Sequence, residues 1–382
     1  MFELGNNNMT TLTRTDTSLV GQWWWTVDRW FLGALLILVF FGVLMVFGAS
    51  PAVATKLKLS SYYFIKKHLL VLPVGIAMIF LISLLSPKNV KRLAVIGLLI
   101  GMIILGLTLI FGSEIKGARR WLSAGGFSLQ ASEFIKPFFA VVAAWMFSEW
   151  RSKTSFPGHF ISLMMFIIIV SLVLGQPDLG QTVVISAVWS CQFFLAGLPL
   201  FFVISFFIFG ISGLVAAYFF FDHVRSRVDR FLDPSKGDTY QIDRSLEAFS
   251  NGGLFGTGPG EGEIKDLLPD AHSDFIFAVA GEEFGVFIAL AVIGLFGFLV
   301  LRGCLRIMSE SSLFVFLAVA GLLIQFGLQA LIHISSSLQL IPAKGMTLPF
   351  ISYGGSSFLA LSIGMGMVLA LTRKRPGREE FL

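Results

Sequence analysis

Long apolar stretches separated by short polar segments dominate the hydropathy pattern of this chain. The ranges 31–55, 93–113 and 345–372, for example, contain no Lys, Arg, Asp or Glu. A helix needs about 20 apolar residues to cross the hydrocarbon core of a bilayer, and core helices of soluble proteins rarely carry runs of that length. The pattern therefore predicts an all-α polytopic membrane protein.

Ten such segments follow one another along the chain. The sixth and seventh are separated only by Gly197-Leu198-Pro199, where a kink within one helix is the alternative to a turn between two. The longest polar interval, 222–274, is predicted to be a large extracytoplasmic loop between helices 7 and 8. The predicted spans are 31–50, 68–86, 93–112, 134–149, 159–176, 180–197, 199–221, 275–301, 312–334 and 353–372.

Composition supports a membrane protein and argues against nucleic acid as a partner. Of the 382 residues, 55% are hydrophobic and 13% are charged, whereas soluble domains carry roughly 25% charged residues. The net charge is +5 and the pI about 9.2, but the chain has no basic stripe and no motif of a nucleic-acid reader. We therefore interpret the basic residues as topology signals and lipid contacts.

The basic residues favour a cytoplasmic N-terminus. That orientation places thirteen Lys and Arg inside and fifteen outside, but excluding the long loop 222–274 leaves thirteen inside and nine outside. The cluster Arg373-Lys374-Arg375 is the clearest single signal. With an even number of spans, the tails 1–30 and 373–382 are both cytoplasmic and flank a transmembrane domain at 31–372.

The polar segment 113–133 carries two adjacent arginines beside a tryptophan, Arg119, Arg120 and Trp121. Guanidinium groups match phosphate oxygens bidentately and Trp favours the membrane interface, so this group suits a phosphate-bearing lipid headgroup. Nonspecific headgroup contact is the alternative. Nearby, Glu133 and Lys136 lie three residues apart at a helix start, where they can pair with each other.

The loop 222–274 contains Arg225, a further candidate cation, and a glycine-rich run at 252–262. Glycine-rich loops can cradle phosphates, but this one lacks the Lys-Ser/Thr ending of a nucleotide-binding loop. An extracellular position would also remove nucleotide as a ligand. A flexible surface loop is therefore favoured over a phosphate cradle.

The end of this loop places carboxylates at the start of an apolar span. Asp274, Glu282 and Glu283 enter a segment where ionised side chains are costly, which makes them functional candidates. The alternative is that Ser273 or Asp274 is only an N-cap. At 100° per residue, Glu282 lies about 80° around the helix from Asp274, so the two can share a cavity, while Glu283 lies on the opposite face and pairs elsewhere.

The segment 340–357 combines prolines, paired glycines and hydroxyl side chains at membrane depth. Irregular backbone is tolerated there only where it packs in protein or lines a wet cavity. Lys344 would supply a positive charge to such a cavity, or it would extend to the headgroups.

These segments together resemble the SEDS family (shape, elongation, division and sporulation) of peptidoglycan polymerases, and its cell-division branch more than its elongation branch. The resemblance implies ten transmembrane helices with cytoplasmic termini in the bacterial inner membrane, at the division septum. It implies a glycosyltransferase that acts on lipid II outside that membrane, with a class B penicillin-binding protein (a transpeptidase) and other division proteins as partners. The matching stretches are GARRW at 117–121, FLDP and DTYQ within 231–241, LPDAHSDFIFAVAGEEFG at 268–285 and PAKGMTLPFISYGGSS at 342–357.

By motif match, the family's essential aspartate falls on Asp274, and its loop arginines and tryptophan fall on Arg119, Arg120 and Trp121. The family's lysine falls on Lys344. One segment departs from the pattern. Similar chains carry asparagines and a glycine before the Pro-Lys-Gly motif, whereas this chain has 333–337, His-Ile-Ser-Ser-Ser. We interpret His333 as a packed polar group rather than a catalyst.

The expected mechanism gives each charged group a role. Asp274 takes the proton from the attacking hydroxyl, and Arg119, Arg120, Lys344 and Arg225 stabilise the departing pyrophosphate. Alternatively, Asp274 holds a divalent cation, Mg²⁺ or Mn²⁺, against the phosphates, so no cofactor is certain. Two other functions remain open, a lipid II flippase and a non-catalytic division scaffold. The enzyme is favoured over the flippase because the polar residues crowd toward one face.

Overall fold

The computed structural model describes residues 18–115, 118–124, 127–153, 155–220, 222–233, 240–342 and 345–374. Most of these residues are helical, and two short helices, α9 and α10, lie in the loop 222–274. The helices are α1 (Leu19–Thr26), α2 (Arg29–Lys56), α3 (Tyr63–Ser83), α4 (Pro87–Phe111), α5 (Ala131–Ser152), α6 (Gly158–Gly175), α7 (Leu179–Leu195), α8 (Leu200–Phe220), α9 (Asp222–Leu232), α10 (Tyr240–Gly252), the 3₁₀ helix η2 (Ile264–Asp266), α11 (Ile276–Ile307), α12 (Leu313–Ser337) and α13 (Gly355–Thr372).

Each of the ten predicted spans is occupied by a helix, α2–α8 and α11–α13. By length and composition, eight of the described helices can cross a membrane, and α7, with 17 residues, is among the shorter apolar helices. The chain is thus a multi-pass membrane protein, while the count of ten crossings stays a prediction. Between α7 and α8 the chain turns at Gly197, whose φ of 94° suits glycine, so the two segments are separate helices.

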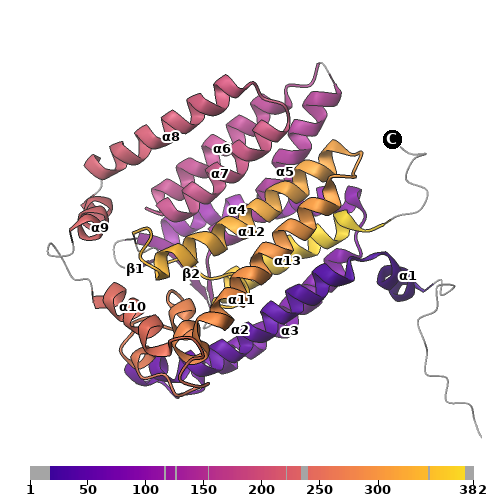
Figure 1. Ribbon diagram of the computed structural model, residues 1–382. Coiled ribbons are helices and arrows are strands. Elements are labelled where there is room, and N and C mark those ends of the chain that lie inside the picture. The colour runs from indigo at the N-terminus through magenta and orange to yellow at the C-terminus, as the bar shows by residue number, and fades with distance from the viewer. Residues whose placement is uncertain are drawn as a thin grey trace, which may run out of the picture.

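The helices form one bundle with α5, α12 and α13 at its centre (Figure 1). In the most apolar window of each helix, 83% of α5, 67% of α12 and 89% of α13 is buried, against 22% of α3 and α6. Helix α8 lies at the outer edge beside α7 (Figure 1). Because α5 and α12 are surrounded by protein, they can carry polar side chains at membrane depth.

A small antiparallel sheet interrupts the otherwise helical fold between α4 and α5. Its strands, in the order β1-β2-β3, are β1 (Ser113–Ile115), β2 (Ala118–Ala124) and β3 (Phe127–Leu129). The strands of this sheet, which lie in the polar segment 113–133, were not predicted from the sequence. Pairing the strands satisfies backbone N–H and C=O groups that lie next to the membrane, which gives the polar segment a fixed shape.

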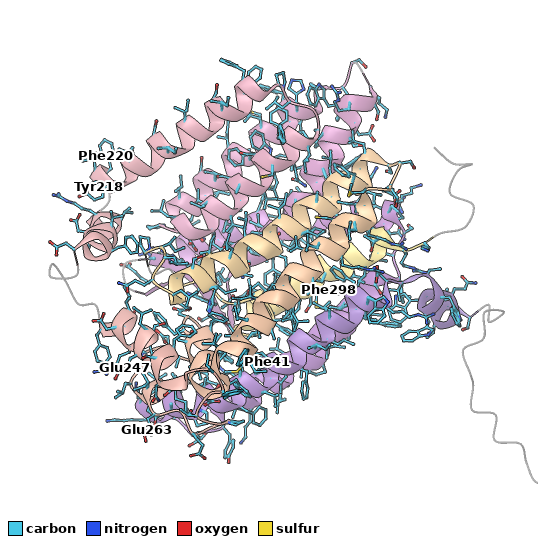
Figure 2. The ribbon with its side chains drawn as sticks, in the orientation of Figure 1. Phe41, Tyr218, Phe220, Glu247, Glu263 and Phe298 are labelled. Atoms are coloured by element: carbon cyan, nitrogen blue, oxygen red, sulfur yellow. The ribbon has the colours of Figure 1, made fainter. Side chains whose placement is uncertain are left out.

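The loop 222–274 packs in part as a layer at the end of the bundle where α11 starts. Figure 2 shows Glu247 of α10 and Glu263 in this layer. Ser245 Oγ donates to the carbonyl of Ser337 at 2.7 Å, which ties α10 to the end of α12. The layer is therefore anchored to the bundle through buried contacts.

Candidate functional site

Asp274 lies in a turn, two residues before α11 begins, and its side chain is half-buried. Its backbone N–H donates to the carbonyl of Asp270 at 3.0 Å. The N-cap of α11 is Phe275, which makes no side-chain capping bond, so neither Ser273 nor Asp274 is the cap. The N-cap alternative is thereby contradicted, and Asp274 stays a candidate for chemistry.

The segment 345–353 packs directly against the Asp274 turn. A Cβ added to Gly345 would lie only 3.0 Å from Asp274 Oδ2, so the glycine lets the chain approach the carboxylate closely. Tyr353 N donates to the carbonyl of His272 at 2.8 Å, and Ser352 Oγ donates to that of Ser273 at 2.7 Å. The two motifs that carry most of the family resemblance therefore form one site.

Aromatic rings line one side of this site. The His272 imidazole lies 4.5 Å from the Phe64 ring and 5.0 Å from the Tyr353 ring, measured between centroids. Burial lowers the pKa of His272 to about 4, against a smaller opposing effect of Asp270. His272 is thus uncharged at neutral pH, and it belongs to the wall of the site rather than to its cations. The motif match had pointed only to the neighbouring aspartate.

The two adjacent arginines of β2 point in different directions, because successive side chains alternate along a strand. Arg119 pairs with Glu114 of β1 at 3.3 Å and is about half exposed, at 49%. Arg120 donates from Nε to the carbonyl of Gln176 at 3.2 Å and also donates to the carbonyl of Pro177. Only Arg120 is therefore fixed against the turn between α6 and α7.

Asp178 in that turn is the acidic partner of Arg120. The Arg120 Nε and Asp178 Oδ2 atoms lie 3.8 Å apart, and Asp178 caps α7 by accepting from Gln181 N at 3.3 Å. Burial raises the pKa of the Asp178 carboxyl, and the Arg120 guanidinium opposes that rise. Trp121, the third member of the group, is half-buried, and its carbonyl accepts from Ser113 Oγ at 3.2 Å.

A buried polar chain crosses the centre of the bundle and reaches the segment next to Asp274. Lys136 Nζ lies 3.0 Å from Glu133 Oε2, and the two side chains are only 1% and 5% exposed. The expectation that these residues pair is confirmed. Gln181 of α7 donates to Glu133, and Lys136 donates to Gln329 Oε1 of α12 at 3.0 Å.

Gln329 carries this chain to the site. Its amide Nε2 donates to the carbonyl of Thr347 at 3.2 Å and to Ser357 Oγ at 3.2 Å. Nearby, His333 is buried, and its Nδ1 lies 2.6 Å from the carbonyl of Met346. The expectation that His333 is a packed polar group is therefore confirmed. Gln181 and Gln329 were not predicted as part of this polar chain. The sequence of an apolar helix does not show which of its polar side chains will find a partner on another helix.

Glu282 is fully buried, and its carboxylate oxygens bind the loop that precedes α11. Oε1 accepts from Asn251 Nδ2 at 3.0 Å and from Ile264 N at 2.8 Å, while Oε2 accepts from Lys265 N at 3.0 Å. Glu283 pairs instead with Lys265 Nζ at 2.5 Å. The hydrogen bonds of the Glu282 side chain thus go to segment 251–265, whereas Asp274 packs against Gly345.

The glycine-rich run pairs with a break in α11 at Gly285, whose φ is 76° and ψ 179°. The amides of Thr257 and Gly258 donate to the carbonyls of Glu282 and Glu283 at 2.9 and 3.0 Å. Across the break, the amide of Val286 donates to the carbonyl of Gly253 at 3.0 Å. Most of the run lies exposed at the surface, as interpreted from the sequence, but its backbone is paired with α11. The run supplies the backbone partners that the broken helix lacks.

Two further cations, Arg225 and Lys344, were predicted to stabilise the pyrophosphate. Arg225 lies on α9, where it is 62% exposed, and it pairs with Asp229 at 3.7 Å. Lys344 lies outside the described residues. Within the described ranges, no group of three or more His, Cys, Asp or Glu side chains is arranged to hold a metal ion, so a divalent cation stays an expectation.

Fold and site together define a polytopic membrane protein with a polar centre at one end of its bundle. The chain belongs to the FtsW, RodA and SpoVE family of cell cycle proteins, the SEDS family, whose model matches residues 28–376. It is 44% identical to a probable peptidoglycan glycosyltransferase FtsW from Caulobacter vibrioides over 376 residues, covering 98% of this chain and 96% of the relative. A probable FtsW from Trichlorobacter lovleyi is 34% identical over 88% of this chain and 91% of its own.

Solved structures of related proteins share the fold. A chain of a complex reported as "Structural coordination of polymerization and crosslinking by a peptidoglycan synthase complex" aligns with a TM-score of 0.75 and 25% identity, over 91% of this chain and 97% of its own. The rod shape determining protein RodA of Thermus thermophilus aligns with a TM-score of 0.68 and 25% identity, over the same shares.

Proposed function

We propose that this chain is an FtsW-type peptidoglycan glycosyltransferase that polymerises lipid II into glycan strands. The observation that carries the proposal is the close packing of Asp274 against the segment 345–353, in a chain 44% identical to a probable enzyme of this kind. A carboxylate at the start of α11 beside irregular backbone suits a polar substrate that reaches the end of the bundle.

In the proposed reaction, a hydroxyl oxygen of one lipid-linked disaccharide attacks the anomeric carbon of another. The new glycosidic bond forms as the bond to the lipid pyrophosphate breaks, and the proton of the hydroxyl passes to Asp274. The pyrophosphate leaves as an anion, so no strong acid is required. Charge on that anion is stabilised by cations, for which Arg119, Arg120, Lys344 and Arg225 are the candidates.

The contacts of the two loop arginines refine this assignment. Arg120 is held by carbonyls of the α6–α7 turn, so it is preorganised and loses little side-chain entropy on binding. Among the described residues, the ion-pair partner of Arg119 is exposed Glu114, which a diphosphate can displace. Asp274 holding Mg²⁺ or Mn²⁺ is the alternative role, and loss of polymerisation in EDTA with recovery on adding Mn²⁺ would favour it.

We further propose that both termini are cytoplasmic, that the site opens outside the inner membrane at the division septum, and that a class B penicillin-binding protein binds this chain. The complex named for polymerization and crosslinking, to which the chain is similar in fold, supports such a partner. Polar residues gathered at one end of the bundle support a site that works from one membrane face.

The proposal is tested with the purified chain in liposomes that contain fluorescent lipid II, with and without the cognate transpeptidase. We expect glycan chains visible on gels. Movement of lipid II between leaflets without glycan chains would contradict the proposal and favour the flippase. Full complementation of a depleted strain by Asp274→Asn would favour the scaffold.

A further inference from the structure

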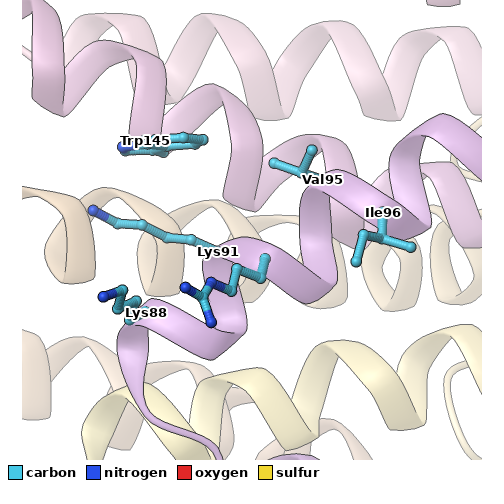
Figure 3. Close-up of a pocket in the computed structure, with 6 residues that line it drawn as sticks. Lys88, Lys91, Val95, Ile96 and Trp145 are labelled. Atoms are coloured by element: carbon cyan, nitrogen blue, oxygen red, sulfur yellow. The ribbon is translucent and has the colours of Figure 1, made fainter.

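A groove of about 370 Å³ lies between the start of α4 and the second half of α5, away from the Asp274 site. Figure 3 shows Lys88 and Lys91 of α4 approaching it, with Trp145 of α5 across from them. Since α4 begins here and ends at β1, the groove lies at the opposite end of α4 from the sheet. The lining residues are Lys88, Lys91, Arg92, Val95, Ile96 and Trp145.

The groove combines three cations with apolar walls. In the described part of the chain, no carboxylate forms an ion pair with Lys88, Lys91 or Arg92. Glu149, which interacts electrostatically with Lys91, is bound to Lys153 at 2.8 Å and accepts from Trp145 Nε1 at 3.0 Å. The cations therefore keep a net positive charge that a bound anion would neutralise.

Lys91 lies against aromatic rings and also interacts electrostatically with Glu149 and Lys153. Its Nζ lies 4.3 Å from the Phe314 ring of α12 and 5.5 Å from the Trp145 ring, both within cation–π range. The α4 helix also begins here, with Ser86 Oγ accepting from Asn89 N at 3.3 Å, so the positive end of its dipole faces the same region. Each feature favours an anion at the groove.

The apolar half of the groove favours an amphipathic ligand over a simple ion, because an ion would leave the apolar wall uncovered. Ile96 is 58% exposed on the outer surface of α4, and Val95 and Trp145 continue the apolar wall. An acyl chain would cover this wall, while a phosphate would meet the cations one turn nearer the start of α4. The groove thus places cations toward the start of α4 and apolar side chains beside them, the two surfaces that a phospholipid headgroup and acyl chain require.

We propose that this groove is a binding site for an anionic phospholipid, with the phosphate held by Lys88, Lys91 and Arg92 and an acyl chain against Val95, Ile96 and Trp145. In the predicted topology the site lies in the cytoplasmic leaflet, so its occupant is distinct from a substrate on the outer face. The proposal depends on the membrane location of the chain and not on the reaction at Asp274.

The test measures phosphatidylglycerol binding to the delipidated full chain by native mass spectrometry. We expect the parent to retain phosphatidylglycerol in preference to phosphatidylethanolamine. The double variant Lys88→Gln/Arg92→Gln should bind it roughly ten-fold more weakly, because each basic group near an anionic lipid contributes to attraction. The matched control is Lys58→Gln/Lys66→Gln, which removes the same charge from exposed sites just after α2 and in the first turn of α3.

A second measurement does not depend on whether the charge variants fold. Phosphatidylglycerol brominated on its acyl chains should quench the fluorescence of Trp145, read as the difference between the parent and Trp145→Phe. Equal binding by the double variant, equal loss in the control pair, or no Trp145-dependent quenching would each overturn the proposal. Displacement of the lipid by glycerol phosphate at equal concentration would overturn it as well, since a soluble phosphate would then suffice.

Discussion

Single side chains in this protein are held in place by partners from distant parts of the chain. Arg120 reaches the turn between α6 and α7, Lys136 reaches α12, and Asp274 lies against the backbone of Gly345. Lys136 is almost fully buried, so removing its partner leaves a charge that neither water nor the bilayer can solvate. Asp178, the partner of Arg120, is also largely buried. Stability and pH dependence should therefore respond to single substitutions at these positions.

Glu133→Gln should destabilise the protein by about 3 kcal/mol, because it leaves the buried Lys136 charge without its counterion. The measurement is the apparent melting temperature in detergent. The double variant Glu133→Gln/Lys136→Met should recover much of the loss, since both charges are then gone. A single variant as stable as the parent would mean that the buried pair makes no net contribution.

Arg120→Gln should make stability more sensitive to pH. Burial raises the folded-state pKa of Asp178 above its unfolded value, which costs stability as pH rises from the unfolded toward the folded pKa. Removing the Arg120 guanidinium raises the folded-state pKa of Asp178 further. The loss of folding stability therefore becomes larger and continues to a higher pH. We expect a larger fall in melting temperature at pH 8 than at pH 5.

The matched variants for this pH effect are Arg120→Lys, which keeps the charge, and Arg120→Gln/Asp178→Asn, which removes the titrating group. Both should lose the extra pH sensitivity. An Arg120→Gln variant whose deficit is the same at pH 5 and pH 8 would show that Asp178 does not feel the guanidinium.

At the scale of elements, α11 depends on the loop before it. The helix is broken at Gly285, and the backbone groups on both sides of the break pair with residues 253–258. The buried carboxylate of Glu282 holds the same loop through the amides of Ile264 and Lys265. Loop and helix therefore form one unit, which also sets where α11 begins beside Asp274.

Gly285→Ala should disrupt this unit. A Cβ there would lie 2.4 Å from Gly256 N and 2.5 Å from the Leu254 carbonyl oxygen, in a backbone conformation that costs other residues about 1–3 kcal/mol. We expect a lower melting temperature and faster proteolysis within 250–266. Gly294→Ala is the control in the same helix, since a Cβ there meets nothing within 4 Å, and it should be neutral or slightly stabilising.

The sequence predicted the helices well because each span carries its own signal, a long apolar run that needs no partner to be recognised. It also identified Asp274 and the segment around Gly345, whose motifs lie side by side in the structure. The break in α11 could not be predicted, because the glycine run and Gly285 have meaning only once they pair. The opposite directions of Arg119 and Arg120 likewise depend on a strand that the expected loop did not include.

At the scale of the whole molecule, the Asp274 turn and the groove at Lys88 lie at different ends of the bundle. Helices α2 and α4 each run from one end to the other. The groove lies where α4 begins, and the Asp274 turn lies at the opposite end. The predicted topology assigns these ends to opposite sides of the membrane. The cations at Lys88 and Arg373 after α13 would then face the cytoplasm, in agreement with the positive-inside rule.

Cysteine labelling tests this topology. In a parent with Cys191 and Cys304 replaced, Lys66→Cys should react with a membrane-impermeant maleimide in cells whose outer layers are permeable to the reagent. Lys88→Cys should react only after the inner membrane is opened. Both positions are exposed, so burial does not hide either of them. The reverse labelling pattern would mean that the Asp274 end faces the cytosol.

The central claim is that the Asp274 carboxylate performs the chemistry, and its most direct test is the initial rate of lipid II polymerisation by purified Asp274→Asn. The matched control is Asp270→Asn, which removes one negative charge from an exposed position in the same turn, where Asn tolerates the φ of 53°. We predict a loss of at least about 100-fold for Asp274→Asn, as expected for a lost general base, and near-parent activity for the control. A parent rate in Asp274→Asn, with both proteins folded, would contradict the account.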